Sequence, residues 1–458
     1  MLFGIALSAQ DLAEQSRLAS KAMAQGRFRE AAALYQKAGL RLQLALAWFS
    51  AEDYPRAEAE LLQLTRQQPT LQPAWFLLGL TYQKRSQPFK AIAPLRTALT
   101  LKATDENARF ELADAYLNTG QSALAAREFR AVTERNPSHA KAWQGVGASY
   151  LSMASVASKS LERNAPESGF RYALLAESRA RQRRWPEAFV LYRRAQALGV
   201  LGLHRSIAAI YAETGHPDWA ATEAALEGPQ ASQDWQATLQ RYEGQATPEA
   251  LYWTARAATA LFEQTLTKLQ TLPDSGALHE LRAEANELQG RRAEAVAEWR
   301  TALRLAPKDP RVEGSLGRAL WRNREYDEAL PILSRMAAHQ PHVAEWNYLL
   351  GDLYYRLEQA PKAVALLEAA LRREPGQVAA HAVLGRVYMQ LGEPGKALPH
   401  LQAAFSTDED GSLYYQLGLA YRRTGQETLA QAMFARQREA QTQSEAAAEL
   451  PLTPPAVR

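Results

Sequence analysis

The sequence repeats itself with a period of 34 residues, and this repeat constrains the fold more than any other feature. From Trp75, apolar or small residues follow at +3, +4 and +7, and a second set follows at +16, +20 and +23. Residues three, four and seven apart share one face of a helix, so each set predicts one helix. Between the two sets stands Gln87-Pro88-Phe89, which is typical of a turn. Each copy of the repeat therefore predicts a hairpin of two helices.

The same spacing returns through most of the chain, with small residues where the two helices of a hairpin cross. Further copies are Arg109, Leu112, Ala113, Tyr116, Ala125 and Phe129; Leu316, Gly317, Leu320, Ala329 and Leu333; and Leu350, Gly351, Tyr354, Ala363 and Leu367. The pattern resembles the tetratricopeptide repeat family, whose unit reads W-x2-L-G-x2-Y, then A-x3-F, then P. The resemblance covers about nine-tenths of the chain. It implies an all-α solenoid, a right-handed superhelix of helical hairpins, in a bacterial protein of many repeats that binds other proteins.

Breaks in the period suggest two arrays of hairpins joined by an irregular segment, because the sequence around Gly228-Pro229 and Gly244 shows no helical period. The C-terminal end contains three prolines and is expected to be disordered. The predicted segments are 1–10, 11–227 (N-terminal array), 228–247 (irregular junction), 248–442 (C-terminal array) and 443–458 (disordered tail).

Inside each array, one long helix is expected to replace a hairpin. The first runs from Trp143 to about Arg163 and stops before Pro166. The second begins at Thr247-Pro248, a good helix entry because proline fits the first turn, and ends before Pro273.

Residues 1–10 allow two interpretations. Residues 2–7 form a short apolar run, and Ser8-Ala9-Gln10 could form a cleavage site. A complete secretory signal needs basic residues before the run, so the segment is either the remnant of a signal peptide or the apolar start of a capping helix. We favour export, to the periplasm of a bacterium, with the cytoplasm as the alternative.

Composition excludes several classes of function. The formal net charge of +4 is small for 458 residues and does not indicate a nucleic-acid-binding surface. The chain has no cysteine, which excludes disulfides, thiolate metal sites and a cysteine nucleophile. No apolar run approaches the roughly 18 residues that cross a bilayer. The partner is therefore expected to be a protein or peptide, with no nucleic acid and no integral membrane segment, and the oligomeric state stays open.

The short motifs that carry chemistry are incomplete. The segment from Gly392 to Lys396 has two residues between its glycines where a phosphate loop has four, and it occupies a hairpin turn. His279-Glu280 lacks the second histidine of a zinc protease, because Ala283 stands in that place. No nucleophile elbow or dinucleotide-binding loop is present. The chain is predicted not to be an enzyme and to have no catalytic residue, metal site or cofactor.

The predicted binding surface is the concave face of the superhelix, which the first helix of each pair lines in this family. Positions +1, +5 and +8 from the Trp position lie opposite the packing stripe. In the second array these positions and their neighbours combine arginine with aromatic residues, as binding hot spots do. They are Arg318, Trp321, Arg322, Tyr348, Tyr355, Arg356, Arg386, Tyr415 and Arg422.

The remaining positions of this kind predict the character of the partner. Glu280, Glu284 and Glu287 would form an acidic rung at one end of the second array. Arginine pairs with carboxylates and aromatics supply apolar area, so we expect a partner segment that mixes acidic and apolar residues. In the first array the equivalent positions are largely apolar and define a secondary groove at Phe76, Leu80, Phe110 and Leu117.

Two alternatives stay open from the sequence. The arginine and aromatic side chains could instead serve helix ends and the packing between repeats, without any partner. The chain could also be a docking or accessory subunit of an enzyme, or of an envelope assembly or secretion complex, with no catalytic domain of its own.

Overall fold

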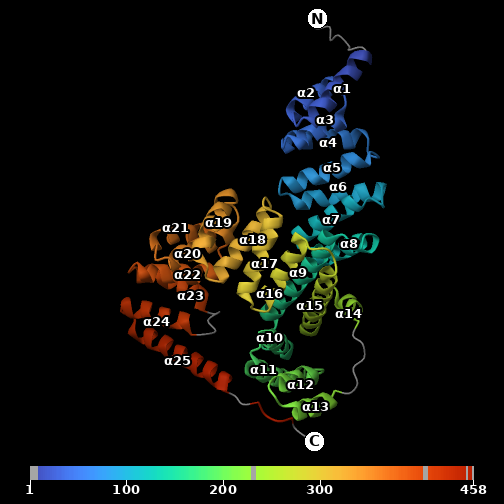
Figure 1. Cartoon of the computed structure of the whole chain (residues 1–458). Coiled ribbons are helices and arrows are strands. Elements are labelled where there is room, and N and C mark those ends of the chain that lie inside the picture. Colours follow the sequence, from blue (N-terminus) through green and yellow to red (C-terminus); the bar gives the residue numbers. More distant parts are fainter. Residues whose placement is uncertain (1–8, 228–233, 406–410, 450–451, 456–458) are drawn as a thin grey trace. The chain divides into compact units, whose positions relative to one another are not determined.

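The computed structural model describes residues 9–227, 234–405, 411–449 and 452–455. Within these residues it contains 25 α-helices and no strand (Figure 1). The prediction of an all-α solenoid of helical hairpins is thereby confirmed. Residues 1–8, which carry most of the predicted signal remnant or capping segment, lie outside the described residues.

Two compact units make up the chain, and each is described by itself. Unit 1 comprises Met1–Ala157, Trp235–Gln240 and Thr254–Pro273, and unit 2 comprises Ser158–Asp234, Arg241–Trp253 and Asp274–Arg458. This division by contacts cuts three helices, α9 (Ala140–Asn164), α14 (Trp235–Tyr242) and α15 (Pro248–Gln270). It differs from the arrays expected from the sequence, which stay a prediction.

Unit 1 contains four helical pairs and the greater part of two long helices. The second helix of each of the first three pairs packs against the first helix of the next. The pairs are α1 (Ala9–Ala24) with α2 (Phe28–Lys37), α3 (Arg41–Ser50) with α4 (Tyr54–Gln67), α5 (Gln72–Lys84) with α6 (Pro88–Leu101), and α7 (Glu106–Asn118) with α8 (Ser122–Arg135). The single long helices expected from the sequence are present as α9 (Ala140–Asn164) and α15 (Pro248–Gln270).

Unit 2 contains seven pairs, and we call the earlier helix of each pair its first helix. The pairs are α10 (Gly169–Arg181) with α11 (Trp185–Ala197), α12 (His204–Glu213) with α13 (Pro217–Ala225), α16 (Gly276–Leu288) with α17 (Arg292–Leu305), α18 (Pro310–Arg322) with α19 (Tyr326–His339), α20 (Ala344–Arg356) with α21 (Ala360–Arg373), α22 (Val378–Gln390) with α23 (Pro394–Ala404), and α24 (Ser412–Arg423) with α25 (Glu427–Glu449). The first helices α18, α20, α22 and α24 also contact one another in sequence order.

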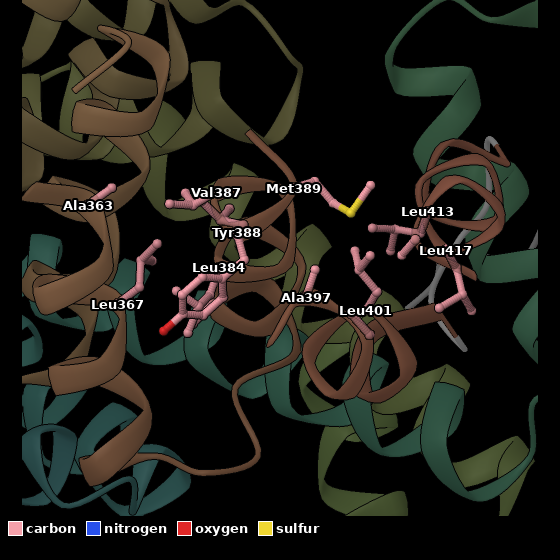
Figure 2. Close-up of a cluster of buried hydrophobic side chains, with 14 of the residues drawn as sticks. Ala363, Leu367, Leu384, Val387, Tyr388, Met389, Ala397, Leu401, Leu413 and Leu417 are labelled. Atoms are coloured by element: carbon pink, nitrogen blue, oxygen red, sulfur yellow. The ribbon is translucent and has the colours of Figure 1, made fainter. Parts of the chain in front are cut away.

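The two helices of a hairpin approach closely where a glycine faces a leucine. A Cβ atom on Gly351 would lie 2.8 Å from Leu367 Cγ, and one on Gly385 would lie 2.7 Å from Leu401 Cγ. Such distances are shorter than real carbon contacts, so these positions need glycine. Figure 2 shows the core built around these crossings, where Leu384 and Tyr388 lie among the side chains of the neighbouring helices.

The structure differs from the sequence prediction in two segments. The junction 228–247 was expected to be irregular, but α14 (Trp235–Tyr242) lies within it, and eight residues are too few to show a helical period. The tail from residue 443 was expected to be disordered, but α25 continues through Glu449. Glutamine, alanine and glutamate favour helix, and the first proline of the tail comes only at Pro451.

Candidate partner-binding site

The residues predicted to bind a partner lie on four consecutive first helices of unit 2, α18, α20, α22 and α24. We call them, together with Glu280, Glu284 and Glu287 on α16, the first-helix face. Because neighbouring first helices contact each other, side chains at equivalent positions can meet across the repeat boundary. That this face is concave stays a prediction.

A buried carboxylate organises the middle of this face. Asp352 on α20 has a side chain only 1% exposed. Its Oδ2 accepts hydrogen bonds from Trp321 Nε1 at 2.7 Å and from Arg356 Nε at 2.6 Å. Asp352 Oδ1 has no hydrogen-bond partner among the described residues. A buried carboxylate needs such donors, so Trp321 and Arg356 hold the negative charge of Asp352 in place.

Tyr348 belongs to the same group. Its ring meets the Trp321 ring edge-on, with centroids 6.1 Å apart and planes at 67°, a favourable aromatic geometry. Burial, followed by the negative charge of Asp352, raises the pKa of Tyr348 to about 12. The phenol is therefore protonated at neutral pH and keeps a hydrogen-bond donor on this face.

The other arginines of α18 are also matched by carboxylates of the chain. Arg318 Nε lies 3.0 Å from Glu345 Oε1 on α20, and its guanidinium lies 5.7 Å from the centre of the Trp346 ring. Arg322 Nη1 donates to Glu287 Oε2 on α16 at 2.5 Å. These two positive charges are therefore largely balanced inside the array.

The acidic rung on α16 is balanced in the same way. Arg311 Nη1 donates to Glu280 Oε2 at 3.1 Å, and Glu287 also accepts from Trp299 Nε1 at 2.9 Å. Glu284 Oε2 has no partner among the described residues. Burial, followed by the charges of Glu280 and Glu287, raises the pKa of Glu284 to about 8, so at neutral pH this carboxyl is mostly protonated.

The α22–α24 end of the face is different. Arg386 Nη2 donates to Ser412 Oγ at 3.1 Å, and among the described residues no carboxylate forms an ion pair with Arg386. The Arg422 guanidinium lies 5.7 Å from the centre of the Phe434 ring. Tyr415 is 46% exposed. Tyr355, at the end of α20, is half-buried against the core of these helices. Among the described residues, no carboxylate neutralises Arg386 or Arg422 at this end.

The residues predicted to form a secondary groove lie in unit 1, on the first helices α5 and α7, which contact each other. That they form a groove stays a prediction. Phe110 meets Phe129 edge-on at 5.4 Å and stacks on His139 at 5.3 Å, so much of its ring is used in packing. Phe76, Leu80 and Leu117 are half-buried.

Sequence reasoning missed three residues that pair with the predicted ones: Asp352 and Glu345 pair with arginines, and Arg311 pairs with Glu280. The signal for Asp352 was available, because it occupies the same +5 position as Arg318 and Arg386. The +5 positions of α16, α18, α20 and α22 alternate in charge as Glu284, Arg318, Asp352 and Arg386. Among the described residues, however, these +5 side chains do not pair with one another: Arg318 pairs with Glu345, and Asp352 accepts from Trp321 and Arg356.

Two further observations concern other kinds of site. Across the residues that the structure describes, no three histidine, cysteine, aspartate or glutamate side chains gather where they could hold a metal ion. A search of the same residues finds no helix with the length and apolar character needed to span a membrane.

Comparison with known proteins identifies the repeat. The family model of the tetratricopeptide repeat matches residues 110–152, 255–310, 315–378 and 350–412, and a second model of this repeat matches 411–437. No curated protein matches the sequence.

Solved structures of MamA are similar to part of the chain. A crystal structure of MamA is 21% identical, covers 36% of this chain and 96% of its own, and gives a TM-score of 0.31. MamA from Desulfovibrio magneticus RS-1, from its residue 41 to the end, is 22% identical, with 38% and 97% covered and a TM-score of 0.33.

Proposed function

Because the chain belongs to the tetratricopeptide repeat family, we propose that it is a protein-interaction scaffold whose first-helix face holds a segment of a partner protein. The observation that carries the proposal is the α22–α24 end of that face. There, Arg386 and Arg422 lack a carboxylate partner among the described residues, and Tyr415 is largely exposed. Arginine without a carboxylate partner, beside exposed aromatic area, is what interface hot spots contain.

The chemistry of this end defines the partner segment. An arginine guanidinium can bind a carboxylate with two parallel hydrogen bonds, which gives both energy and orientation. Tyrosine adds apolar contact area at little cost in rotamer entropy. The segment would therefore carry acidic residues near Arg386 and Arg422 and apolar residues near Tyr355 and Tyr415. At the opposite end, Glu280 and Glu287 are paired with arginines and Glu284 is mostly protonated, so the α16 glutamates add little to this preference.

The other predicted residues have a supporting role in this proposal. Trp321 and Tyr348 present aromatic surface, but they also hold the buried Asp352. Arg318, Arg322 and Arg356 are already paired with carboxylates, so an acidic ligand would have to compete with those contacts. Tetratricopeptide repeats are in general not catalytic, and we propose no activity, cofactor or metal for this chain.

The test begins with the purified chain as bait, which identifies the bound protein and, by fragments, the bound segment. A binding isotherm for Arg386→Glu should then show affinity for that segment reduced at least about tenfold, roughly 1.4 kcal/mol. The matched control is Arg372→Glu on the second helix α21, where the side chain is 69% exposed and lies off the face. It should bind like the wild type.

Ionic strength and a second substitution complete the experiment. The effect of Arg386→Glu should shrink at high salt, because screening weakens charge pairs. Tyr415→Ala should weaken binding by about 1–2 kcal/mol without salt dependence. If both variants bind as the wild type does at low and high salt, the first-helix face does not bind the partner. The groove at Phe76 and Phe110 would then be tested.

A further inference from the structure

Residues near the C-terminus contact the helical pair α12–α13 of the same chain. Residues 452–455 read Leu-Thr-Pro-Pro, and the hydroxyl of Tyr211 on α12 donates a hydrogen bond to the backbone carbonyl of Thr453. Pro455 is buried and Leu452 is half-buried, whereas Thr453 and Pro454 are exposed. In Figure 1 this segment is the short red stretch near α12 and α13. All of these residues belong to unit 2.

The helix that precedes the tail also contacts this part of unit 2. Helix α25 packs against α11, which is far from it in sequence. The hydrogen bond of Tyr211 is thus the end of a longer contact between the C-terminal helix and the α11–α13 region.

The surface that receives the tail is rich in aromatic rings. Around Tyr211 stand Phe189 of α11, with ring centroids 5.5 Å apart, and Trp219 of α13, at 5.6 Å and nearly perpendicular. The ring of His216 stacks on Trp219 at 4.3 Å. Aromatic surfaces with a hydrogen-bond donor are the usual receptors for proline-rich segments, which are extended before they bind and so lose little entropy.

A buried polar network orients the hydroxyl of Tyr211. Arg193 binds both oxygens of Glu223, at 2.9 and 2.8 Å, and donates to Tyr211 Oη at 3.0 Å. Glu223 is fully buried, and His204 Nδ1 lies 2.8 Å from it. Since arginine can only donate, Tyr211 Oη accepts from Arg193 and must give its own proton to another acceptor. Among the described residues that acceptor is the Thr453 carbonyl.

We propose that α11, α12 and α13 form a binding site for an extended, proline-containing peptide segment, and that residues 452–455 of this chain occupy it as a tethered ligand. Tyr211 recognises the carbonyl that precedes the first proline, and the aromatic rings accept apolar side chains and proline rings. This site is separate from the first-helix face. A free segment of the same chemistry competes with the tail, which the tether keeps at a high local concentration.

The experiment uses the full-length chain and a fluorescent peptide with the sequence of residues 450–458, followed by anisotropy. The double variant Pro454→Gly/Pro455→Gly keeps the length of the tail but removes its preformed extended shape. We expect the peptide to bind this variant at least about tenfold more tightly than it binds the wild type, whose own tail occupies the site. Circular dichroism should show unchanged helix content.

Tyr211→Phe, added to the double variant, tests the hydroxyl. Loss of this hydrogen bond should weaken the peptide about tenfold. The matched control is Tyr388→Phe, which removes a hydroxyl that donates to Glu368 elsewhere in unit 2 and should leave peptide binding unchanged. The proposal is overturned if the peptide binds wild type and double variant equally, or if Tyr211→Phe behaves like Tyr388→Phe. The molar mass in solution is measured at several concentrations. If the wild type forms a dimer at high concentration and the double variant stays a monomer, the tail binds a second copy of the chain, and the tethered arrangement is wrong.

Discussion

The two ends of the first-helix face use the same residue types at equivalent positions and yet differ in what those residues do. On α18 and α20, Arg318, Arg322 and Arg356 each meet a carboxylate of the chain. On α22 and α24, Arg386 meets a serine hydroxyl and Arg422 an aromatic ring. The position within a repeat determines where a side chain points. Whether a neighbouring helix supplies a carboxylate for that side chain then determines whether the side chain can bind a partner instead.

The charges at the +5 positions also differ between the two ends. Charge alternates through Glu284, Arg318, Asp352 and Arg386, and the next +5 position, on α24, is Leu419. Asp352 holds the +5 position one pair before Arg386. Its carboxylate already accepts hydrogen bonds from Trp321 and Arg356. The alternation therefore ends with an arginine that lacks a carboxylate partner among the described residues.

The largest expected effect is the loss of Asp352. Asp352→Ala removes the acceptor of Trp321 Nε1 and the ion-pair partner of Arg356, and we expect a loss of about 2 kcal/mol in unfolding free energy. The cost stays below that of a fully buried pair because the Arg356 side chain is 39% exposed and can be solvated. Denaturant unfolding, with hydrogen exchange in α18 and α20 to localise the change, measures it.

The matched substitution at the other end is Arg386→Ala. It removes one part-buried hydrogen bond, to Ser412, and no ion pair with a described residue, so the change in unfolding free energy should stay within about 0.5 kcal/mol. Equal destabilisation by Asp352→Ala and Arg386→Ala would mean that the two ends do not differ in the way proposed.

The pH response of the α16–α20 end provides the next prediction. The pKa of Glu284 is raised from its ordinary 4.5 to about 8 in the folded chain. Folding therefore takes up a proton between these values, so this part of the array loses stability as the pH rises from 4.5 to 8. Glu284→Gln should remove that dependence and stabilise the array at pH 7 by on the order of 1–2 kcal/mol.

Thermal melts between pH 5 and pH 9 measure this response. Glu374→Gln, at an exposed position after α21, is the control and should keep the wild-type pH profile. A Glu284→Gln profile that still falls with pH would show that another group is responsible.

How far the sequence predicts this molecule can be judged from these residues. The hairpins follow from spacing alone, because a small residue such as Gly351 and a large apolar one such as Leu367 recur in phase where two helices cross. The long helices α9 and α15 follow from missing turn residues. Periodicity gives no information on α14, since eight residues are fewer than three turns.

The binding face was harder to predict than the fold. The positions of Arg318 and Trp321 follow from the repeat, but their carboxylate partners lie 27 and 31 residues away, on the first helix of the next pair. Whether those side chains meet depends on the offset between neighbouring helices, which the spacing within one repeat does not contain. The contact of Tyr211 with Thr453 spans 242 residues and leaves no periodic signal.

The α22–α24 end should respond to pH in the opposite sense. Burial, followed by the neighbouring His381, lowers the pKa of His400 below its ordinary 6.5. The two Nδ1 atoms lie 2.9 Å apart, and the His400 ring stacks on Tyr388, whose hydroxyl donates to Glu368. The unfolded chain binds a proton at His400 more readily than the folded chain, so stability is lost as the pH falls through 6.5.

His400→Phe keeps a ring against Tyr388 and removes this titration. Its melting temperature should depend less on pH below 6.5 than that of the wild type, by a smaller amount than at Glu284. His342→Phe, at an exposed histidine, is the control. Identical acid profiles for the wild type and His400→Phe would exclude His400 as the acid-sensitive group.

The smallest effect concerns the turns between the helices of a pair, which also differ between the two ends. In the turns after α22 and α24, the residue with positive φ is a glycine, Gly392 and Gly425 respectively. In the turns after α18 and α20 it is Arg324, with φ 65°, and Glu358, with φ 58°. Both side chains are exposed, so they gain little from packing there. A non-glycine residue in this region is strained by its Cβ, and glycine costs entropy in the unfolded chain.

Because the strain is the larger of these two contributions, Glu358→Gly should raise stability by about 0.5 kcal/mol, and Gly392→Ala should lower it by about 1 kcal/mol. Nothing lies within 4 Å of a Cβ atom placed on Gly392, so any loss at that position reports backbone strain alone. The two variants are compared by denaturant midpoints and by hydrogen exchange in the adjoining helices. If Glu358→Gly destabilises α20 and α21, the Glu358 side chain makes a favourable contribution that outweighs its backbone strain, and the turns of the two ends are not interchangeable.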